Sequence, residues 1–386
     1  MIAERSNPLP SDRAEILQRL ADYEMLLEIG VKLSGTLDLL TVLETALETA
    51  EQVCHAETSS IWELDEDTQE LFFRVVRGQA AGEIRHLRVS VGQGIVGSVA
   101  KSGRAEMVND VAADSRWRGD AKGFRTRAIL TVPLQVQGST VGVLQLLNPV
   151  GRERFTEEDL QRLTLFAAVL APPLQNARLH AAQERQFLKL VTALAETIDK
   201  KDPYTGGHVR RVVSYSVLLG AALGLGRGQL KELWLAATLH DIGKIGVPDR
   251  ILGKPAPLDP EEAEVMKRHP VDGAEIVSHL SNPNVLVGVR NHHERIDGRG
   301  YPDGLREDEL PLVARIIAVA DTFDAMTTSR PYRAGLPGEQ AAAEIRAAAG
   351  SQLCPRVVAA FHDLFASGRF TLAASEDILR SIYEPV

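Results

Sequence analysis

The sequence predicts a protein of two domains, an α+β domain with an antiparallel sheet followed by an all-α domain, joined by a long helical linker. At 386 residues the chain exceeds what one hydrophobic core usually organises. Short β-rich segments separated by turns occupy the first part of the chain, whereas nearly everything beyond Ile198 has helical periodicity. We place an N-terminal tail and helix start at 1–19, the first domain at 20–178, the linker helix at 160–200 and the second domain at 186–386.

The composition is that of an ordinary globular protein, with 44% apolar and 25% charged residues. A net charge of -9 opposes non-specific binding to anions, so we expect neither a nucleic-acid partner nor a membrane partner. The best apolar run, 166–174, is too short to span a bilayer, and we expect a cytoplasmic protein. Cys54 and Cys354 alone support neither a disulfide framework nor a thiolate metal cluster.

The first domain begins with helices and continues with strands. Apolar residues at helical spacing, such as Leu17 and Leu27, predict a helix before a second one over 39–53. The period then changes to that of short strands, which we expect over 59–64, 71–76, 86–89, 129–136 and 140–147. Gln137-Gly138-Ser139, between the last two strands, predicts a hairpin turn.

Three short motifs of this domain occur in a recognisable order: Gly92-Gln93-Gly94-Ile95-Val96-Gly97, Val132-Pro133-Leu134 and Val141-Gly142-Val143-Leu144. Together they resemble the GAF family of ligand-sensing domains, which implies a sensory role with a ligand that the sequence does not identify. Asn148, Phe155 and Asp159 partly match a pattern of GAF domains that bind cyclic nucleotides. Because Pro149 replaces the Lys of that pattern, we favour a structural interpretation in which Thr156 is the N-cap of a helix.

The linker carries apolar residues at nearly heptad spacing: Leu160, Leu163, Leu170, Leu174, Ala177, Leu188, Val191 and Ile198. We call these residues the apolar seam. Such a stripe needs a partner, so we expect a homodimer in which two linker helices bury it. Glu184 falls on the seam near its centre, where two like charges would face each other. The pair Pro172-Pro173 removes two backbone donors and should break or kink the helix near the boundary of the first domain.

Several helical segments of the second domain carry His or Asp where their own periodicity calls for an apolar residue. Asp241, for example, continues the stripe of Leu230 and Leu233. Seven such groups are expected to converge inward: His208, His240, Asp241, His269, His292, His293 and Asp321. Burying them without a partner would be costly, so they predict metal binding. We assign no ligand role to the remaining histidines: His55, His86, His180, His279 and His362.

Imidazole and carboxylate without thiolate suit Fe or Mn first, and Ni or Zn as alternatives. Seven ligands are too many for one ion that must keep a position open for water, so the cluster predicts two divalent metals. The partition we expect gives one ion to His208, His240 and Asp321, the other to His269, His292 and His293, with Asp241 as the bridge. Such a pair suits phosphodiester hydrolysis, with Asp241 in a catalytic role.

Lys244 follows Asp241 by three residues, just past the end of the predicted helix. It is our second candidate catalytic residue, contacting a phosphate oxygen of the substrate or assisting the departing sugar oxygen. The alternative is a solvated loop lysine without a role in the reaction.

His208, the pair His240-Asp241 and Asp321 resemble the metal-binding signature of the HD hydrolase superfamily. Three longer segments resemble its HD-GYP subfamily of cyclic di-GMP phosphodiesterases: Leu239-His240-Asp241-Ile242-Gly243-Lys244, His292-His293-Glu294-Arg295-Ile296-Asp297-Gly298-Arg299-Gly300-Tyr301-Pro302 and Arg330-Pro331-Tyr332-Arg333. The second segment is specific, because so many fixed letters rarely arise in order by chance. The resemblance implies hydrolysis of cyclic di-GMP to pGpG and onward to GMP, regulation by the GAF domain, and a diguanylate cyclase as protein partner.

Residues around the predicted metals are candidates for substrate binding. The guanidinium groups of Arg330 and Arg333 can donate paired hydrogen bonds to the second phosphate of a cyclic dinucleotide, or they cap the preceding helix. Tyr301 lines the substrate groove, faces a partner protein or belongs to a structural turn. Glu294 and Asp297 are expected to brace the loop behind the ligands.

Some relatives hold a third metal on a carboxylate placed shortly before the first histidine. Tyr204 stands one turn before His208 in this sequence, which favours two metals. Asp202 is the alternative carboxylate that could reach the site.

Two other functions stay open. A degenerate domain would bind a cyclic dinucleotide or a protein without hydrolysing it, although the seven intact ligand positions argue against this. An HD hydrolase could also act on another cyclic dinucleotide or on a nucleotide phosphate.

Overall fold

The computed structural model describes residues 38–65, 68–77, 87–117, 124–201, 207–329 and 334–383, with a few single positions before residue 38. The chain divides into two compact units, Met1–Gln183 and Glu184–Val386. The first is α+β and the second is helical, which confirms the predicted fold class. Several predictions fall outside the described residues: the helix around Leu17 and Leu27, Asp202, Tyr204, and the Arg330 to Arg333 segment.

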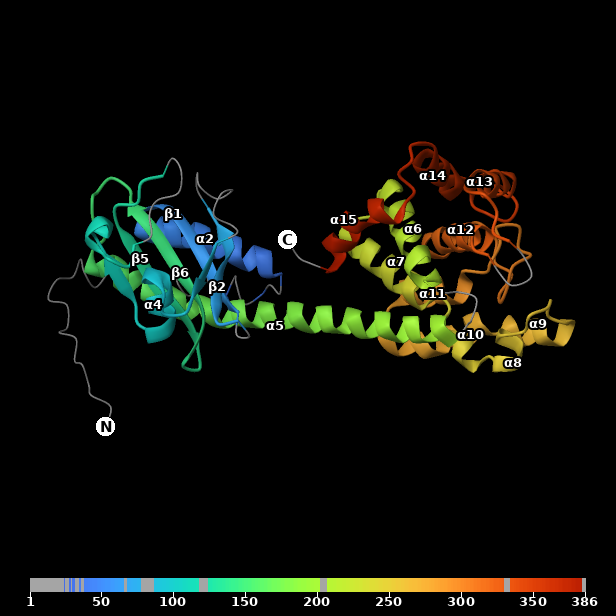
Figure 1. Ribbon diagram of the computed structural model, residues 1–386, viewed down its shortest axis with the longest axis horizontal. Helices are drawn as coiled ribbons and strands as arrows, with labels where there is room; N and C mark the ends of the chain where they lie inside the picture. The colour runs from blue at the N-terminus through green and yellow to red at the C-terminus, as the bar shows by residue number, and fades with distance from the viewer. Residues whose placement is uncertain are drawn as a thin grey trace. The chain divides into compact units, whose positions relative to one another are not determined.

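The first unit contains an antiparallel sheet of six strands in the order β3-β2-β1-β6-β5-β4 (Figure 1). The strands are β1 (Ala56–Asp65), β2 (Glu70–Val76), β3 (Arg88–Ser90), β4 (Glu106–Val108), β5 (Ile129–Val136) and β6 (Ser139–Pro149). The sequence predicted all of them except β4. With three residues, β4 is too short to display an alternating pattern.

The hairpin between β5 and β6 has the predicted two-residue turn. Gln137 and Gly138 have φ values of 51° and 83°, and Val136 pairs with Ser139 across the turn. Positive φ at both central positions matches the right-handed twist of the flanking strands, and glycine adopts it without steric cost. The turn prediction is therefore confirmed.

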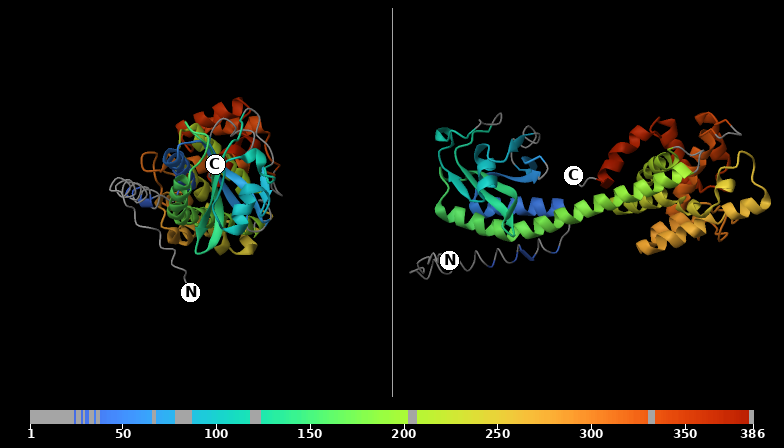
Figure 2. Two further views of the ribbon diagram at one scale, coloured as in Figure 1. Left: turned by 90° about the vertical axis from the view of Figure 1, so that its left-hand side faces the viewer. Right: turned by 60° about the horizontal axis from the view of Figure 1, so that its bottom comes forward.

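Helices cover both faces of the sheet. Helix α2 (Leu39–Cys54) begins at Asp38, whose carboxylate accepts the backbone N–H of Thr41, and it packs on one face together with the N-terminal part of α5 (Figures 1 and 2). Helix α4 (Gly94–Ser102) covers the other face, where Val96 and Val99 meet Trp62 of β1. The short 3₁₀ helix η1 (Val111–Ala113) follows β4.

Helix α5 runs without interruption from Glu157 to Lys201, so the predicted break at Pro172-Pro173 is wrong. The helix starts as expected: Thr156 Oγ1 accepts the N–H of Asp159 at 3.3 Å, and Thr156 N–H donates back to the Asp159 carboxylate at 2.7 Å. The carbonyl that Pro172 leaves without a donor is that of Ala168, which is exposed and can bond to water. Neighbouring residues buried in the core of the first unit, including Leu170 and Leu174, hold the helix in place.

The apolar seam is buried inside the two units themselves. Leu170 and Leu174 lie in the core of the first unit, and Leu188 and Val191 lie in that of the second. Glu184 forms an ion pair with Lys231 of its own chain at 2.5 Å. The seam is therefore not available to a second chain, and our prediction that it forms a dimer interface is wrong.

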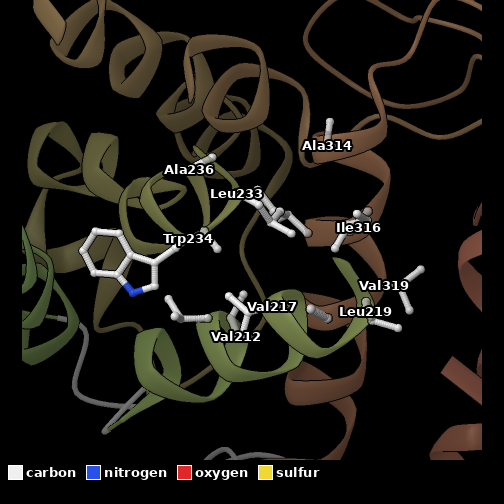
Figure 3. Packing of buried hydrophobic residues seen from close by; sticks show 14 of the residues in the cluster. Val212, Val217, Leu219, Leu233, Trp234, Ala236, Ala314, Ile316 and Val319 are labelled. Atoms are coloured by element: carbon white, nitrogen blue, oxygen red, sulfur yellow. The ribbon is translucent and has the colours of Figure 1, made fainter. Parts of the chain in front are cut away.

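The second unit consists of helices: the end of α5, α6 (His208–Ala222), α7 (Arg227–Leu239), η2 (Ile242–Gly246), α8 (Asp249–Leu252), α9 (Pro260–Met266), α10 (His269–Val277), η3 (Ser278–Leu280), α11 (Pro283–Asn291), α12 (Leu312–Thr327), α13 (Gly338–Ala347), α14 (Pro355–Ala366) and α15 (Leu372–Tyr383). Its core lies where α6, α7 and α12 meet, with Leu219, Leu233, Trp234 and Ile316 fully or almost fully buried (Figure 3). Among the described residues, no helix combines the length and apolarity needed to cross a membrane.

Candidate metal centre

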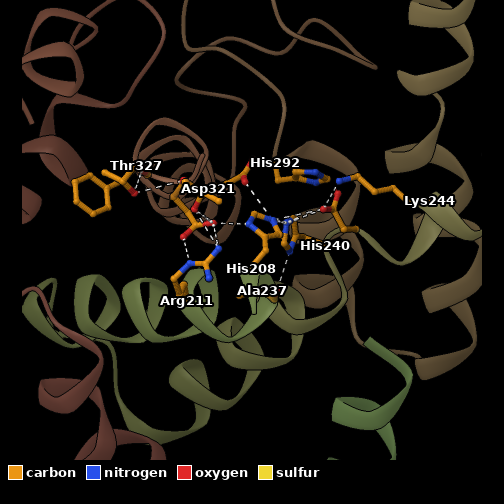
Figure 4. Close-up of polar contacts among 12 residues, drawn as sticks. His208, Arg211, Ala237, His240, Lys244, His292, Asp321 and Thr327 are labelled. Atoms are coloured by element: carbon orange, nitrogen blue, oxygen red, sulfur yellow. Dashed lines mark hydrogen bonds and ion pairs between the residues drawn. The ribbon is translucent and has the colours of Figure 1, made fainter. Parts of the chain in front are cut away.

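The seven predicted ligands come from helix termini and from one helix interior, and they meet in the second unit. Figure 4 labels His208, His240, His292 and Asp321 among them. His208 and His269 are the first residues of α6 and α10, whereas Asp321 lies within α12. The remaining four follow directly on helix ends: His240 and Asp241 on α7, His292 and His293 on α11. Because helix ends carry the groups, their spacing in the sequence is irregular although they share one site.

The ligand atoms fall into two groups. One contains His208, His240 and Asp241, and the other contains His269, His292 and His293; within each group the atoms lie within 4.8 Å of one another. The carboxylate of Asp321 lies 3.5 Å from His208 Nε2 and so belongs with the first group. This grouping is the one that the predicted two-metal partition requires.

The two oxygens of Asp241 face different groups. Oδ2 lies 3.6 Å from His208 Nε2 and 3.4 Å from His240 Nε2, whereas Oδ1 lies 3.3 Å from His269 Nε2. A carboxylate in this position can give one oxygen to each of two cations.

The histidines are oriented as ligands by bonds on their other ring nitrogen. Nδ1 of His240, His269 and His292 lies 2.8, 2.7 and 2.7 Å from the carbonyl oxygens of Ala237, Met266 and Val289, so each Nδ1 keeps its proton and donates it. The Nε2 lone pairs then point inward.

These lone pairs are too close to one another without a cation. Nε2 of His269 lies 3.3 Å from Nε2 of His292, and both rings carry their proton on Nδ1. Two acceptor nitrogens at this separation repel each other unless a proton or a metal lies beside both. The donor set and its orientation therefore fit metal ions.

Burial and neighbouring charges give most of these groups the protonation state that can bind a metal. Burial lowers the pKa of His240, and it lowers that of His293 to about 3, which keeps both imidazoles neutral. Burial alone would favour the neutral acid of Asp241, but Lys244 and the neighbouring histidines hold its pKa well below the usual range. For His208, burial also lowers the pKa, but Asp241 and Asp324 outweigh it and raise the pKa to about 10. His208 must therefore lose a proton before it can ligate.

Asp324 and Arg211 are site residues that our sequence reasoning missed. Asp324 is 1% exposed, its Oδ2 lies 2.7 Å from His208 Nδ1, and Arg211 Nε donates to its Oδ1 at 2.5 Å. His208 is thus oriented by a carboxylate, whereas three other histidines are oriented by backbone carbonyls. The signal was available: Asp324 follows Asp321 by three residues on one helix, and Arg211 follows His208 by the same interval.

We expect Asp324→Ala to weaken metal binding about 10- to 100-fold, because His208 loses the acceptor that fixes its ring and its proton. Asp324→Asn should recover part of the loss, since its amide oxygen can still accept the Nδ1 proton. Dialysis against increasing concentrations of a chelator, followed by elemental analysis, measures the metal that each protein retains. Asp363 is exposed, so Asp363→Ala is the control. Equal metal retention in the Asp324→Ala and Asp363→Ala proteins would contradict this role.

Lys244 lies inside the site rather than in a solvated loop. Its ammonium is 2.7 Å from Asp241 Oδ2, and its side chain is only 16% exposed. The turn that carries it, η2, is fixed on two sides. A Cβ on Gly243 would lie 2.0 Å from the carbonyl oxygen of His269, so this close approach requires glycine. On the other side, Lys201 at the end of α5 donates to the carbonyls of Ile245 and Val247 at 3.0 and 2.9 Å.

Tyr301 lies against a ligand histidine, its ring stacked on that of His293 with centroids 4.9 Å apart. The loop around it is held by two acids. Glu294 is 2% exposed and accepts the backbone N–H groups of three consecutive residues, Asp303, Gly304 and Leu305. Asp297 pairs with Arg295 at 2.7 Å. These are the contacts expected of residues that brace a loop.

The partial cyclic-nucleotide pattern of the first unit is used structurally. Asn148 is fully buried; its side chain accepts the backbone N–H of Arg127 at 2.7 Å and donates to Glu57 at 2.9 Å. Asp159 forms an ion pair with Arg152 at 2.7 Å. Both side chains hold the fold together, which agrees with the structural interpretation of the motif.

Comparison with known proteins identifies both halves of the chain. Residues 38–172 match the family model of the GAF domain, and residues 192–357 match that of the HD domain. A cyclic di-GMP phosphodiesterase of Thermotoga maritima is 44% identical over 46% of this chain and 48% of that protein. The cyclic di-GMP phosphodiesterase response regulator RpfG of Xanthomonas campestris is 40% identical over 47% of this chain and 49% of that protein.

A third relative, 3'3'-cGAMP-specific phosphodiesterase 3 of Vibrio cholerae, is 41% identical over 44% of this chain and 37% of that protein. The chain thus spans about half the length of the first two of these relatives and less of the third. The resemblances drawn from short motifs hold in both halves: the chain contains a GAF domain followed by an HD domain.

Proposed function

We propose that the HD domain hydrolyses a phosphodiester bond of a cyclic dinucleotide, with cyclic di-GMP as first candidate and pGpG, then GMP, as products. The observation that carries the proposal is the carboxylate of Asp241, whose two oxygens face two separate groups of histidines. The names of similar proteins support the substrate class.

Two divalent cations, Fe or Mn before Ni or Zn, fit the donor set. The ligands we propose are His208, His240 and Asp321 for one, and His269, His292 and His293 for the other, with Asp241 shared. When bound, such a pair activates a water molecule and stabilises the charge that develops on the attacking and leaving oxygens.

Side chains of the protein itself complete the site. The ammonium of Lys244 can hold a non-bridging phosphate oxygen or give a proton to the departing sugar oxygen. Tyr301, stacked on His293, offers a flat surface beside the proposed metals on which a base can lie. We assign the second phosphate to Arg330 and Arg333, which lie outside the described residues.

A second candidate substrate is 3'3'-cGAMP, favoured by the name of the Vibrio cholerae relative. Anaerobically purified protein, incubated with a panel of cyclic dinucleotides and analysed by chromatography, distinguishes the two. Hydrolysis of cyclic di-GMP at least as fast as that of 3'3'-cGAMP supports our assignment. Binding without any product would indicate a degenerate domain.

Regulation by the GAF domain, a diguanylate cyclase partner and a homodimer complete the proposal. Since the apolar seam is buried, the dimer surface would be the other face of α5 in the second unit, where Leu190 and Leu194 are more than half exposed. Light scattering of the full chain at micromolar concentration tests the dimer. A monomeric chain would contradict the dimer, and a dimer that persists unchanged in the Leu190→Ser protein would contradict this surface.

Purified protein should hold about two metal ions per chain, and loading them at pH 7 should release about one proton per chain. The proton comes from His208, whose pKa of about 10 keeps it protonated without metal, while Asp241 is already ionised. Because protons and metal compete at His208, metal affinity should rise as the pH increases toward 10. Elemental analysis and titration in weak buffer measure both quantities. No bound metal after reconstitution with Mn or Fe would contradict the proposal.

Lys201→Met should lower turnover about tenfold while both metals stay bound, because η2 loses the donor that satisfies its C-terminal carbonyls and Lys244 shifts from Asp241. The neighbouring Lys200 is exposed, so Lys200→Met is a matched control. Steady-state kinetics beside metal analysis separates the two effects. Loss of metal, or equal kinetics in the two variants, would show that Lys201 does not position Lys244.

A further inference from the structure

The loop 294–311 joins the candidate ligand His293 to α12 and contains no helix or strand. Tyr301 lies near its middle, and its ring stacks on that of His293 at 22° with centroids 4.9 Å apart. A side chain in a loop without regular structure keeps its place only where specific contacts hold the loop. These contacts therefore decide how firmly the ring of Tyr301 is placed beside the proposed metals.

Backbone contacts hold the loop to its own first residues. The N–H of Tyr301 donates to the carbonyl of His293 at 3.3 Å, and the carboxylate of Glu294 accepts the three N–H groups that begin with that of Asp303. Gly300 packs so closely on Glu294 that a Cβ would lie 2.4 Å from the Cα of Glu294. All of these contacts join the loop to itself or to His293.

A set of side-chain contacts fastens the same loop to helix α11. The carboxylate of Asp303, two residues after Tyr301, accepts two hydrogen bonds from Arg290: Nε donates to Oδ2 at 2.8 Å, and Nη2 donates to Oδ1 at 2.7 Å. Asn291, which is 3% exposed, donates its Nδ2 proton to Oδ2 at 3.1 Å. We call Arg290, Asn291 and Asp303 the loop clamp.

The loop clamp differs from an isolated ion pair on the surface, which often contributes little. The side chains of Arg290 and Asp303 are each only 32% exposed, and three donors converge on one carboxylate. Hydrogen bonds from Arg290 lower the pKa of Asp303, so this carboxylate is ionised at neutral pH. Paired hydrogen bonds between a guanidinium and a carboxylate fix the direction as well as the distance of the contact.

The loop clamp and two candidate metal ligands share one helix end. The last two residues of α11 belong to the clamp, and His292 and His293 follow them directly. The contacts therefore close a ring: α11 leads to His293, His293 stacks on Tyr301, and Asp303 returns to α11 two residues later. In this ring Tyr301 cannot move far from His293 unless the contacts of Asp303 break.

We propose that the loop clamp positions Tyr301 for the substrate, by keeping its ring on His293 so that a base of the bound cyclic dinucleotide can lie against it. This inference rests on the proposed function. Arg290, Asn291 and Asp303 are positioning residues, since they act through Tyr301 and are not among the proposed metal ligands. Because a base stacks on Tyr301 equally in the bound substrate and in the transition state, the clamp should affect KM and leave kcat nearly unchanged.

Arg290→Met and Asp303→Ala each open the clamp, the first from the helix and the second from the loop. We expect each to raise KM for cyclic di-GMP about 3- to 10-fold, with kcat within about twofold and metal content unchanged. Tyr301→Ala removes the whole ring and should raise KM about 5- to 100-fold, the range for one base that no longer stacks. Arg356→Met is the control, because Arg356 is exposed on α14.

A double substitution shows whether the clamp acts through Tyr301. Adding Arg290→Met to the Tyr301→Ala protein should not raise KM further, because no ring is left to position. A further increase by the factor seen in the single variant would overturn the proposal, and so would an unchanged KM in both clamp variants. Loss of metal in Asp303→Ala would also overturn it, since the clamp would then hold the ligand histidines instead.

Proteolysis reports on the loop itself and needs no turnover. Arg299 is an exposed residue of the loop, and trypsin cleaves after it only when the loop opens locally. Mass spectrometry should find faster cleavage after Arg299 in Arg290→Met and Asp303→Ala than in Arg356→Met. Equal cleavage rates in the three proteins would contradict the clamp.

The binding of cyclic di-GMP separates failure of the clamp from failure of the proposed function. If the wild-type protein converts no cyclic di-GMP, the proposed function is wrong, and the dissociation constant measured by calorimetry replaces KM. A dissociation constant that rises about 3- to 10-fold in Arg290→Met and Asp303→Ala would then still support the clamp. Equal dissociation constants in the wild-type and variant proteins, or no binding to any of them, would overturn it.

Discussion

The Asp241→Asn protein is expected to lose turnover on the order of a thousandfold or more, together with bound metal. Asparagine has nearly the shape of aspartate, but one of its two faces carries N–H donors instead of a charged oxygen. Since the two oxygens of Asp241 face His208 and His240 on one side and His269 on the other, either orientation of the amide removes a ligand from one group. Elemental analysis and kinetics with cyclic di-GMP measure both losses.

His279→Ala is the control for Asp241→Asn. His279 lies in η3 with an exposed side chain, outside both groups of candidate ligands. Its removal should change neither metal content nor turnover. Similar losses in the two variants would mean that the site is assigned to the wrong residues.

Lys244→Ala should lower kcat by about 10- to 1000-fold while metal content stays unchanged, which is the range for one lost electrostatic contact to the reacting groups. The ammonium lies 2.7 Å from Asp241 Oδ2 and is not a proposed metal ligand, so its removal should affect the reaction and not the cations. Pre-steady-state measurement of a single turnover separates the chemical step from product release.

Lys267→Ala provides the comparison for Lys244→Ala. Lys267 pairs with Glu264 at the exposed C-terminal end of α9, so its loss should leave both kcat and metal content unchanged. If Lys244→Ala turns over substrate at the rate of the Lys267→Ala protein with full metal content, Lys244 does not act in the reaction. Loss of metal in Lys244→Ala would instead give it a role in holding Asp241.

The sequence predicted the site well where helical periodicity and polarity conflict. We predicted that Asp241 points inward because it continues the stripe of Leu230 and Leu233; helix α7 in fact ends at Leu239, but Asp241 is still buried and lies with the histidines. Burying such groups without a partner costs so much free energy that a shared cation is the simplest explanation. The antiparallel sheet was predicted equally well. Its strands show alternating apolar and polar residues, and its hairpin turn contains residue types that favour positive φ.

The features that sequence reasoning missed depend on contacts across the fold. The spacing of Asp324 from Asp321 indicates that they share a helix face, but the contact of Asp324 with His208, 116 positions away, follows from the packing of α12 against α6. The continuity of α5 through Pro172-Pro173 depends on the core that holds its flanks, which outweighs the local preference of proline. Because the cores also bury the apolar seam, the seam cannot form a dimer interface.

Since one unbroken helix enters both cores, neither half of this protein can be expressed alone at an arbitrary boundary. A C-terminal fragment that starts after 198 would lack Leu188, Val191 and Ile198, each of which stabilises the second core by roughly 1.5 to 3 kcal/mol through burial. An N-terminal fragment that ends before Ala177 would open the first core in the same way. Fragments of either half should therefore be cut within a few residues of Gln183, where the chain divides.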